Sequence, residues 1–121
     1  MSVELKIQDR SFNFAIRVVK LCQTLDQTPG VSRTLANQLL RSGTSIGANV
    51  SEAQAGQSKK DFIAKMAISA KEARETHYWL KLLTATNIIP EVKLTDLTDE
   101  SNQIIAILTS IIKTAQKNVE G

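Results

Sequence analysis

Residues 39–56, with the sequence LLRSGTSIGANVSEAQAG, contain three glycines together with serine, threonine and asparagine, all of which are weak helix formers. The apolar residues of this region nevertheless recur at the helical spacing of about 100° per residue. One face carries Leu35, Leu39, Ile46, Val50 and Ala53. The two edges of that face carry Ala36, Gly43 and Gly47 on one side and Ser42, Ser45, Asn49 and Glu52 on the other. The pattern predicts a helix over residues 32–56 with a small-residue edge and a polar edge.

Gly43 and Gly47 lie one helical turn apart, and each glycine inside a helix costs about 1 kcal/mol relative to alanine. Close approach of another helix offsets this cost most simply, because no Cβ atom stands between the two backbones. A slightly frayed helix that tolerates the glycines is the alternative. We expect both glycines to face a neighbouring helix. We also expect Asn49 and Glu52 to form interhelical hydrogen bonds rather than half of a polar binding site.

Three further segments show helical periodicity, at about residues 9–25, 59–87 and 95–117. The first has two apolar stripes, one with Phe12, Ala15, Ile16, Val19 and Cys22 and the other with Phe14, Val18, Leu21 and Leu25. The second begins with Ser58 and Asp61, whose spacing is typical of a capping box. Its main apolar face carries Phe62, Met66, Ala70, Ala73, His77 and Leu80. The last has a broad face with Ile104, Ile105, Ile107, Leu108, Ile111 and Ile112.

Four amphipathic helices joined by short links predict one all-α domain over residues 1–121, an antiparallel up-down-up-down four-helix bundle. One bundle core needs only one apolar stripe from each helix, so part of the apolar surface is surplus. Segment 59–87 also has a second apolar set, consisting of Ile68, Trp79, Leu82 and Leu83. Because exposed apolar surface of this extent usually marks an interface, we expect a homo-oligomer with this second set at the subunit contact.

The composition excludes several classes of protein. An apolar content of 42% is typical of a globular chain and not of a disordered one. The single cysteine, Cys22, permits no internal disulfide, which favours a cytoplasmic location. No signal peptide is visible at the N-terminus, and no stretch reaches the length of a membrane span, so we expect no membrane association.

The net charge of +3 is unevenly distributed. Residues 58–90 carry six Lys or Arg and three Asp or Glu, whereas residues 91–121 carry three and five. Ordinary solvated helix faces explain this pattern most simply. The alternative is a weak nucleic-acid surface, with Arg41, Lys59, Lys60, Lys65, Lys71 and Arg74 as candidate phosphate contacts. Aromatic residues make up only 4% of the chain, too few for a base-stacking platform.

Catalytic and metal-binding patterns are nearly absent. The one histidine, His77, lies on an apolar face, where a hydrogen-bonded core or interface histidine is the usual finding. Glu72 and Glu75 do not have the Glu-x-x-His spacing of a di-iron bundle, and Cys22 has no second thiol for zinc. A Cys22–His77 pair is the alternative that would make the chain a small enzyme or metal-binding bundle. We expect no enzyme, no cofactor and no metal.

The chain resembles a family of four-helix bundles, the 23S rRNA intervening-sequence proteins. The likeness is clearest in residues 45–49 (SIGAN), 51–53 (SEA), 58–62 (SKKDF) and 71–80 (KEARETHYWL), and extends to residues 12–21 and 111–118. The resemblance implies a ring-shaped pentamer of four-helix bundles. A related branch, the accessory protein of diversity-generating retroelements, is a basic pentamer that binds RNA and a reverse transcriptase. Most members have no established activity.

These observations predict a non-enzymatic scaffold that assembles mainly with copies of itself. RNA or another protein is the second expected partner. The periodicity predicts the oligomer, and the resemblance implies the number five.

Overall fold

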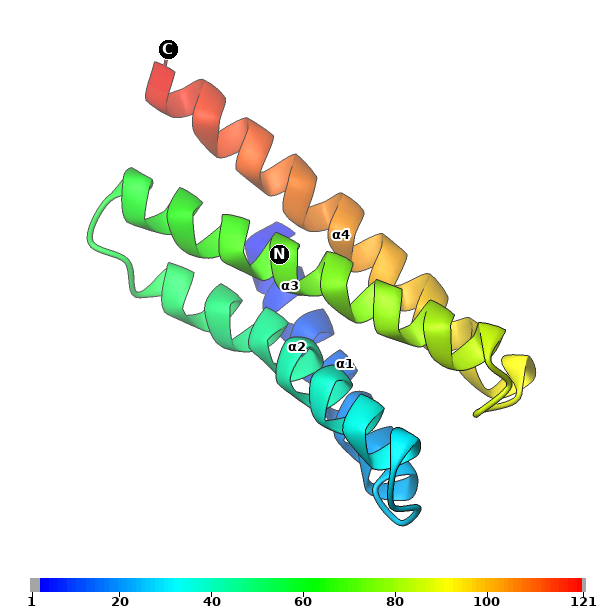
Figure 1. Ribbon diagram of the computed structural model, residues 1–121. Helices are drawn as coiled ribbons and strands as arrows, with labels where there is room; N and C mark the ends of the chain where they lie inside the picture. The colour runs from blue at the N-terminus through cyan, green and yellow to red at the C-terminus, as the bar shows by residue number, and fades with distance from the viewer. Residues whose placement is uncertain (1–2, 121) are drawn as a thin grey trace.

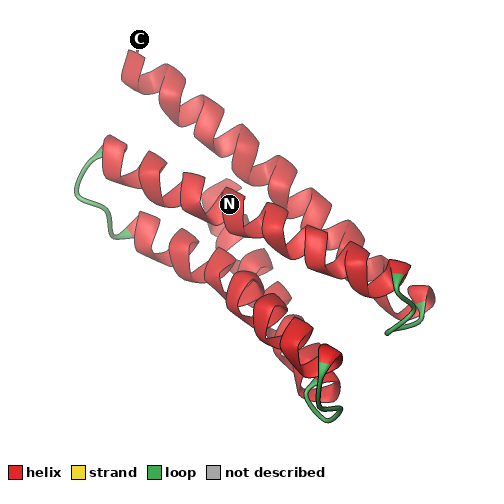
Figure 2. Ribbon diagram, viewed as in Figure 1, coloured by secondary structure: helices red, strands yellow, loops and turns green. Residues whose placement is uncertain are grey.

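The computed structural model describes the backbone of residues 3–120 and the side chains of residues 7–118. It contains four helices, α1 (Val3–Leu25), α2 (Val31–Gln54), α3 (Lys59–Ala85) and α4 (Glu91–Glu120). Consecutive helices run in opposite directions and are joined by short turns, as Figure 1 shows. Residues 3–120 contain no β-strand (Figure 2). The predicted all-α, up-down-up-down bundle is confirmed.

The predicted helix ends need correction, most of all at α1 and α4, while α2 and α3 each end two residues earlier than predicted, at Gln54 and Ala85. α1 begins at Val3 instead of residue 9, and α4 runs from Glu91 to Glu120 instead of 95–117. The added turns bury apolar side chains in the core, Ile7 in α1 and Leu94 in α4. Burial of these side chains stabilises terminal turns whose local sequence has little helical periodicity of its own.

The turns are defined by local chemistry. The Ser58 side chain accepts a hydrogen bond from the Asp61 backbone N–H at 3.1 Å, which confirms the predicted cap of α3. α3 ends in a Schellman motif, in which Ile88 N–H donates to the Leu83 carbonyl and Asn87 N–H to the Thr84 carbonyl. Asn87 takes the left-handed conformation that this motif requires, with φ of 59°.

The core draws side chains from all four helices. Its largest fully buried members are Phe14, Ile7, Leu39, Ile46, Met66, Leu80, Leu83, Leu94, Ile104, Leu108, Val18 and Val50. α1 contributes the stripe that contains Phe14 and Val18. The other α1 stripe faces outward, except that Cys22 is buried and Ala15 is half-buried.

The helices form a four-cornered arrangement in which α1 lies diagonally opposite α3 and α2 lies diagonally opposite α4. α1 packs closely on α2 and only sparsely on α4. Figure 1 shows α1 behind α2 and α3, with the last turns of α4 diverging from the other helices. The bundle is therefore tight along α1–α2–α3–α4 and loose where α4 would close onto α1.

Candidate functional site

The two glycines of α2 lie where this helix crosses α1. A Cβ atom built on Gly43 would lie 2.8 Å from Val18 Cγ1, and one built on Gly47 would lie 3.3 Å from Ser11 Oγ and 3.4 Å from the Ser11 backbone. Val18 and Ser11 are both fully buried. The small-residue edge of α2 therefore sits against α1 within the same chain, at a distance that a larger side chain at Gly43 would not allow.

Buried hydroxyl groups connect α2 to α3. Thr76 Oγ1 donates to Ser42 Oγ at 2.9 Å, and Ser69 Oγ donates to the Ile46 carbonyl at 2.8 Å. The side chains expected in this role do not fill it. Asn49 Nδ2 donates to the Ser45 carbonyl of its own helix, and the exposed Glu52 side chain has no hydrogen bond to a described residue. Short hydroxyl side chains fit between closely packed helices, whereas Asn49 is only half-buried and Glu52 points to solvent.

The outer side of α1 carries an apolar stripe. Phe12, Ile16 and Val19 are 66%, 40% and 37% exposed, and they recur at helical spacing along one stripe. A hollow of about 400 Å³ lies beside this stripe, between α1 and α2. Its described lining consists of Gln8, Phe12, Ala15, Thr44, Gly47, Ala48 and Ser51, none of which is charged. We call Phe12, Ile16 and Val19 the α1 apolar stripe.

The four candidate interface residues of α3 do not form one group. Ile68 is 42% exposed, and Trp79 and Leu82 are half-buried. Leu83 is completely buried inside the chain, so its assignment to a subunit interface was wrong. Around the axis of α3, Leu83 lies close enough to the core-facing side for the neighbouring helices to cover it. Ile68, Trp79 and Leu82 remain interface candidates.

Arg41 is held in an ion-pair cluster between α2 and α3. Its guanidinium lies 3.3 Å from Glu72 Oε2 and also pairs with Glu75. The Trp79 indole N–H donates to the same Glu75 carboxylate at 3.1 Å. Arg41 was a candidate phosphate contact, but two carboxylates already neutralise it. It therefore contributes less to an anion-binding surface than its charge suggests.

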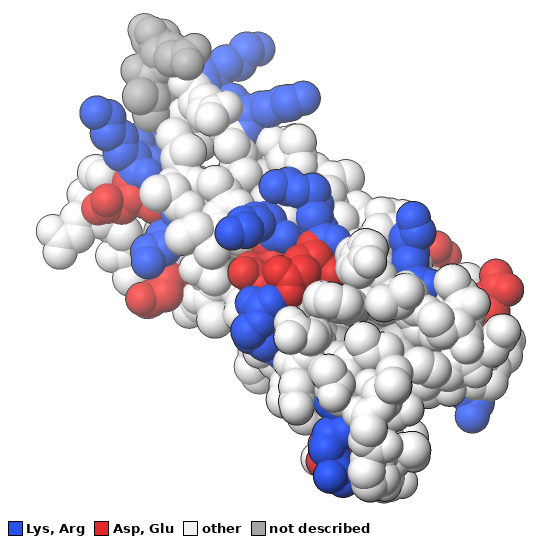
Figure 3. Space-filling view, in the orientation of Figure 1, with Lys and Arg blue, Asp and Glu red and all other residues white. Residues whose placement is uncertain are grey.

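The other candidate phosphate contacts are distributed around α3. Lys59, Lys60, Lys71 and Arg74 are exposed, and Lys65 is half-buried. Figure 3 shows Lys and Arg side chains on this face interleaved with Asp and Glu rather than gathered in one patch. No continuous basic stripe forms on the face that Figure 3 displays.

His77 is joined to α4 through Ser101. His77 Nδ1 lies 2.9 Å from Ser101 Oγ, and Ser101 Oγ lies 2.6 Å from the Thr98 carbonyl. A carbonyl only accepts, so the Ser101 proton points to Thr98 and the neutral His77 ring donates its Nδ1–H to Ser101. Burial and the nearby Lys81 charge lower the pKa of His77. Ser101 is fully buried and His77 is half-buried, so the serine hydroxyl itself is closed off from solvent.

Cys22 is buried in the core. Its thiol donates to the Ala36 carbonyl at 3.4 Å, and burial raises the pKa of the thiol to about 11. A thiol with that pKa is almost entirely protonated at neutral pH and therefore a poor nucleophile. Cys22 and His77 thus have separate partners, on α2 and on α4 respectively. The described residues contain no group of three or more His, Cys, Asp or Glu that could hold a metal ion.

Within residues 3–120, no helix has both the length and the hydropathy needed to cross a lipid bilayer. The described surface instead offers the α1–α2 crossing, exposed apolar side chains on α1 and α3, and scattered cations.

Comparison with known proteins agrees with the bundle architecture. A solved structure with 43% sequence identity and a TM-score of 0.86 covers 93% of this chain and 99% of its own. It is a protein of unknown function from the S23 ribosomal protein family of Bacteroides thetaiotaomicron. No protein of curated function matches the chain. The family model for the 23S rRNA-intervening sequence protein matches residues 3–110, which is most of the chain. The chain belongs to the 23S rRNA-intervening sequence protein family.

Proposed function

We propose that this protein is a non-enzymatic, homo-oligomeric scaffold in which five helical bundles form a ring. The observation that carries the proposal is the exposed α1 apolar stripe, Phe12, Ile16 and Val19. These side chains are surplus to the core, which takes Phe14 and Val18 from the same helix. A contiguous apolar stripe beside an uncharged hollow is typical of a surface that another protein covers.

The occupant that we propose is a second copy of the chain. α3 presents a different exposed apolar residue, Ile68, and the half-buried Trp79 lies about three turns further along the same helix. We call Ile68 and Trp79 the α3 patch. Two different patches on one subunit suit a head-to-tail contact, in which the first patch of one subunit meets the second patch of the next, and such contacts close into rings. The number five comes from the family resemblance. A cytoplasmic location is part of the same proposal and rests on the lone cysteine.

A scaffold is favoured over an enzyme or a metal carrier by the state of the two reactive side chains. Cys22 is a buried, protonated thiol, and His77 donates to a buried serine. Neither residue is accompanied by a described carboxylate cluster that could complete a catalytic or metal site.

Light scattering on purified protein tests the proposal. We expect five times the chain mass of 13.3 kDa. Phe12→Glu should reduce the mass while helical circular dichroism is retained, because Phe12 is 66% exposed in the single chain. Val92→Glu is the matched control, since Val92 is 82% exposed but lies in α4, away from the stripe. A wild-type mass of 13.3 kDa would refute the oligomer, and a dimeric mass would refute the ring.

We propose RNA as a second partner of this scaffold, on the basis of exposed Lys59, Lys60, Lys71 and Arg74. Repetition around a ring would multiply these scattered cations. Affinity for RNA should fall steeply with salt, because phosphate contacts release counterions. Replacing Lys59, Lys60 and Lys65 with Glu should weaken binding further. If varied RNAs do not bind at low salt, only the scaffold remains of the proposal.

A further inference from the structure

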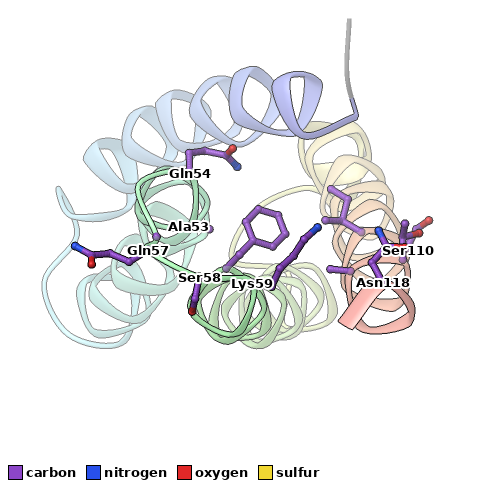
Figure 4. A pocket seen from close by; sticks show the side chains of 12 residues that line it. Ala53, Gln54, Gln57, Ser58, Lys59, Ser110 and Asn118 are labelled. Atoms are coloured by element: carbon purple, nitrogen blue, oxygen red, sulfur yellow. The ribbon is translucent and has the colours of Figure 1, made fainter. Parts of the chain in front are cut away.

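One end of the bundle contains a cavity of about 660 Å³. It lies between the α2–α3 turn, the first turn of α3 and the last turns of α4. Its apolar lining consists of Ala53, Phe62, Ile111 and Ala115. Around these residues stand hydroxyl and amide side chains, including those of Gln54, Ser110 and Asn118 (Figure 4). The cavity is open to solvent, since Gln54, Ser58 and Asn118 are exposed, and its volume lies within the range of small-molecule sites.

The course of α1 explains why this space is open. None of the described lining residues belongs to α1. Figure 4 shows α1 crossing the bundle obliquely instead of running along the other three helices. α1 has 23 residues and α4 has 30, so at about 1.5 Å per residue α1 is roughly 10 Å shorter. The last turns of α4 thus face α2 and α3 without a fourth helix to fill the centre.

The described lining of the cavity carries a positive charge and no negative one. Lys59 is the one charged residue among the lining residues that the structure describes, and none of these is a carboxylate. Lys59 forms no salt bridge with any described residue. Figure 4 shows its side chain extending from α3 toward α4, across the opening. Two more lysines, Lys113 and Lys117, line an adjoining hollow that shares Ser110 and Thr114 with the cavity.

We propose that this cavity binds a small organic anion with an apolar or aromatic body. The anionic group pairs with the Lys59 ammonium, and the body packs against Phe62 and Ile111. Serine, threonine and asparagine side chains at the wall supply hydrogen bonds to the polar end. Lys59 is exposed, so solvent screens this ion pair in part, and the charge contributes more to selectivity than to affinity.

A titration with 2-naphthalenesulfonate, followed by two-dimensional amide NMR, tests the assignment. We expect shifts that cluster at residues 54–62 and 110–118. Lys59→Gln should weaken binding up to about fivefold, as expected for loss of an ion pair at an exposed side chain. Lys60→Gln is the matched control, because Lys60 is the next residue, is exposed and does not line the cavity. The uncharged analogue 2-naphthalenemethanol should bind more weakly than the sulfonate.

A second variant fills the site. Ala115→Trp places an indole in the cavity and should abolish binding while helical circular dichroism is retained. Equal affinity of wild type and Lys59→Gln, or equal affinity for the sulfonate and the alcohol, would overturn the proposal. It would also be overturned if the sulfonate fails to bind wild type at millimolar concentration. A lower oligomer mass for Ala115→Trp would also overturn the proposal, because the cavity would then be a subunit contact.

The scaffold proposal and the anion-site proposal can be refuted independently. The cavity is built within one chain, so the Phe12→Glu variant should bind the sulfonate with wild-type affinity whether or not it assembles.

Discussion

Gly43 sets the distance between α1 and α2. Val18 is fully buried beneath it and, as a β-branched residue, has little freedom to rotate away. We expect Gly43→Ala to lower the free energy of unfolding by about 1 kcal/mol. The strain of overpacking, about 1–3 kcal/mol, exceeds the helix propensity gained by alanine. Urea denaturation measures the change.

Gly47→Ala is the matched control for Gly43. It has the same gain in helix propensity, but its Cβ would lie 3.3 Å from a serine oxygen instead of 2.8 Å from a valine methyl. Gly47→Ala should therefore be less destabilised than Gly43→Ala. In a Val18→Ala background, the effect of Gly43→Ala should shrink, because the methyl groups that it meets are gone. Wild-type stability of Gly43→Ala would contradict the close crossing.

His77 makes stability depend on pH. Burial and Lys81 lower its pKa in the folded protein below the unfolded value of about 6.5. The unfolded chain therefore binds the proton more readily, and stability falls as the pH drops below about 6.5. Because His77 is the one histidine of the chain, its ring resonance in a proton NMR titration needs no assignment. We expect a midpoint below 6.5.

Lys81→Gln separates the two causes of the His77 shift. It removes the positive charge and leaves the burial, so the midpoint should rise toward 6.5 without passing it. A midpoint that falls in this variant would show that Lys81 does not act through its charge.

At the scale of helices, one polar cluster fastens α1 to α4. The Arg10 guanidinium donates to both Glu100 oxygens, at 2.6 and 2.9 Å, and to Gln103 Oε1 at 2.8 Å. This bidentate pair spans the sparsest helix contact of the bundle. Arg10 and Glu100 side chains are 33% and 23% exposed, so solvent screens the pair only in part.

We expect Arg10→Gln to lower the free energy of unfolding by about 1 kcal/mol and to speed amide hydrogen exchange in α1 more than in α3. α1 has few other contacts to α4, so loss of the cluster releases that side of the helix. Arg17→Gln is the control, because Arg17 is exposed on α1 and forms no salt bridge with a described residue. Equal exchange rates in the two variants would show that the cluster does not restrain α1.

At the scale of the molecule, the proposed ring makes a prediction about mixed subunits. In a head-to-tail contact the α1 apolar stripe of one subunit meets the α3 patch of the next. Phe12→Glu and Ile68→Glu should each be monomeric alone, because each destroys one half of every contact. A one-to-one mixture should form a dimer of twice 13.3 kDa, since each variant retains the half that the other has lost. Light scattering measures the mass.

Failure of the mixture to form that dimer would show that the two patches do not meet. If Phe12→Glu disrupts assembly while Ile68→Glu does not, the α1 stripe pairs with itself and the contact is two-fold. Both substitutions are at exposed positions, so circular dichroism should show intact helices in each variant.

The sequence by itself determined the helices and their order. The apolar spacing of α2 and the Ser58 cap depend on chemistry within a few residues, and both appear where expected. The small edge with Gly43 and Gly47 was also visible, because side-chain size and helical position are both local properties.

Only the tertiary structure decided how those helices are used. Both stripes of α1 are apolar, and the rotation of α1 against α2 buries Phe14 while leaving Phe12 exposed. The same packing buries Leu83 in the core, keeps Asn49 on its own helix and pairs Arg41 with two carboxylates. The oblique path of α1 opens the cavity beside Lys59. Helical periodicity gives each side chain an angle about its own axis. Which neighbour meets that angle depends on crossing angles and helix lengths that arise only when all four helices pack together.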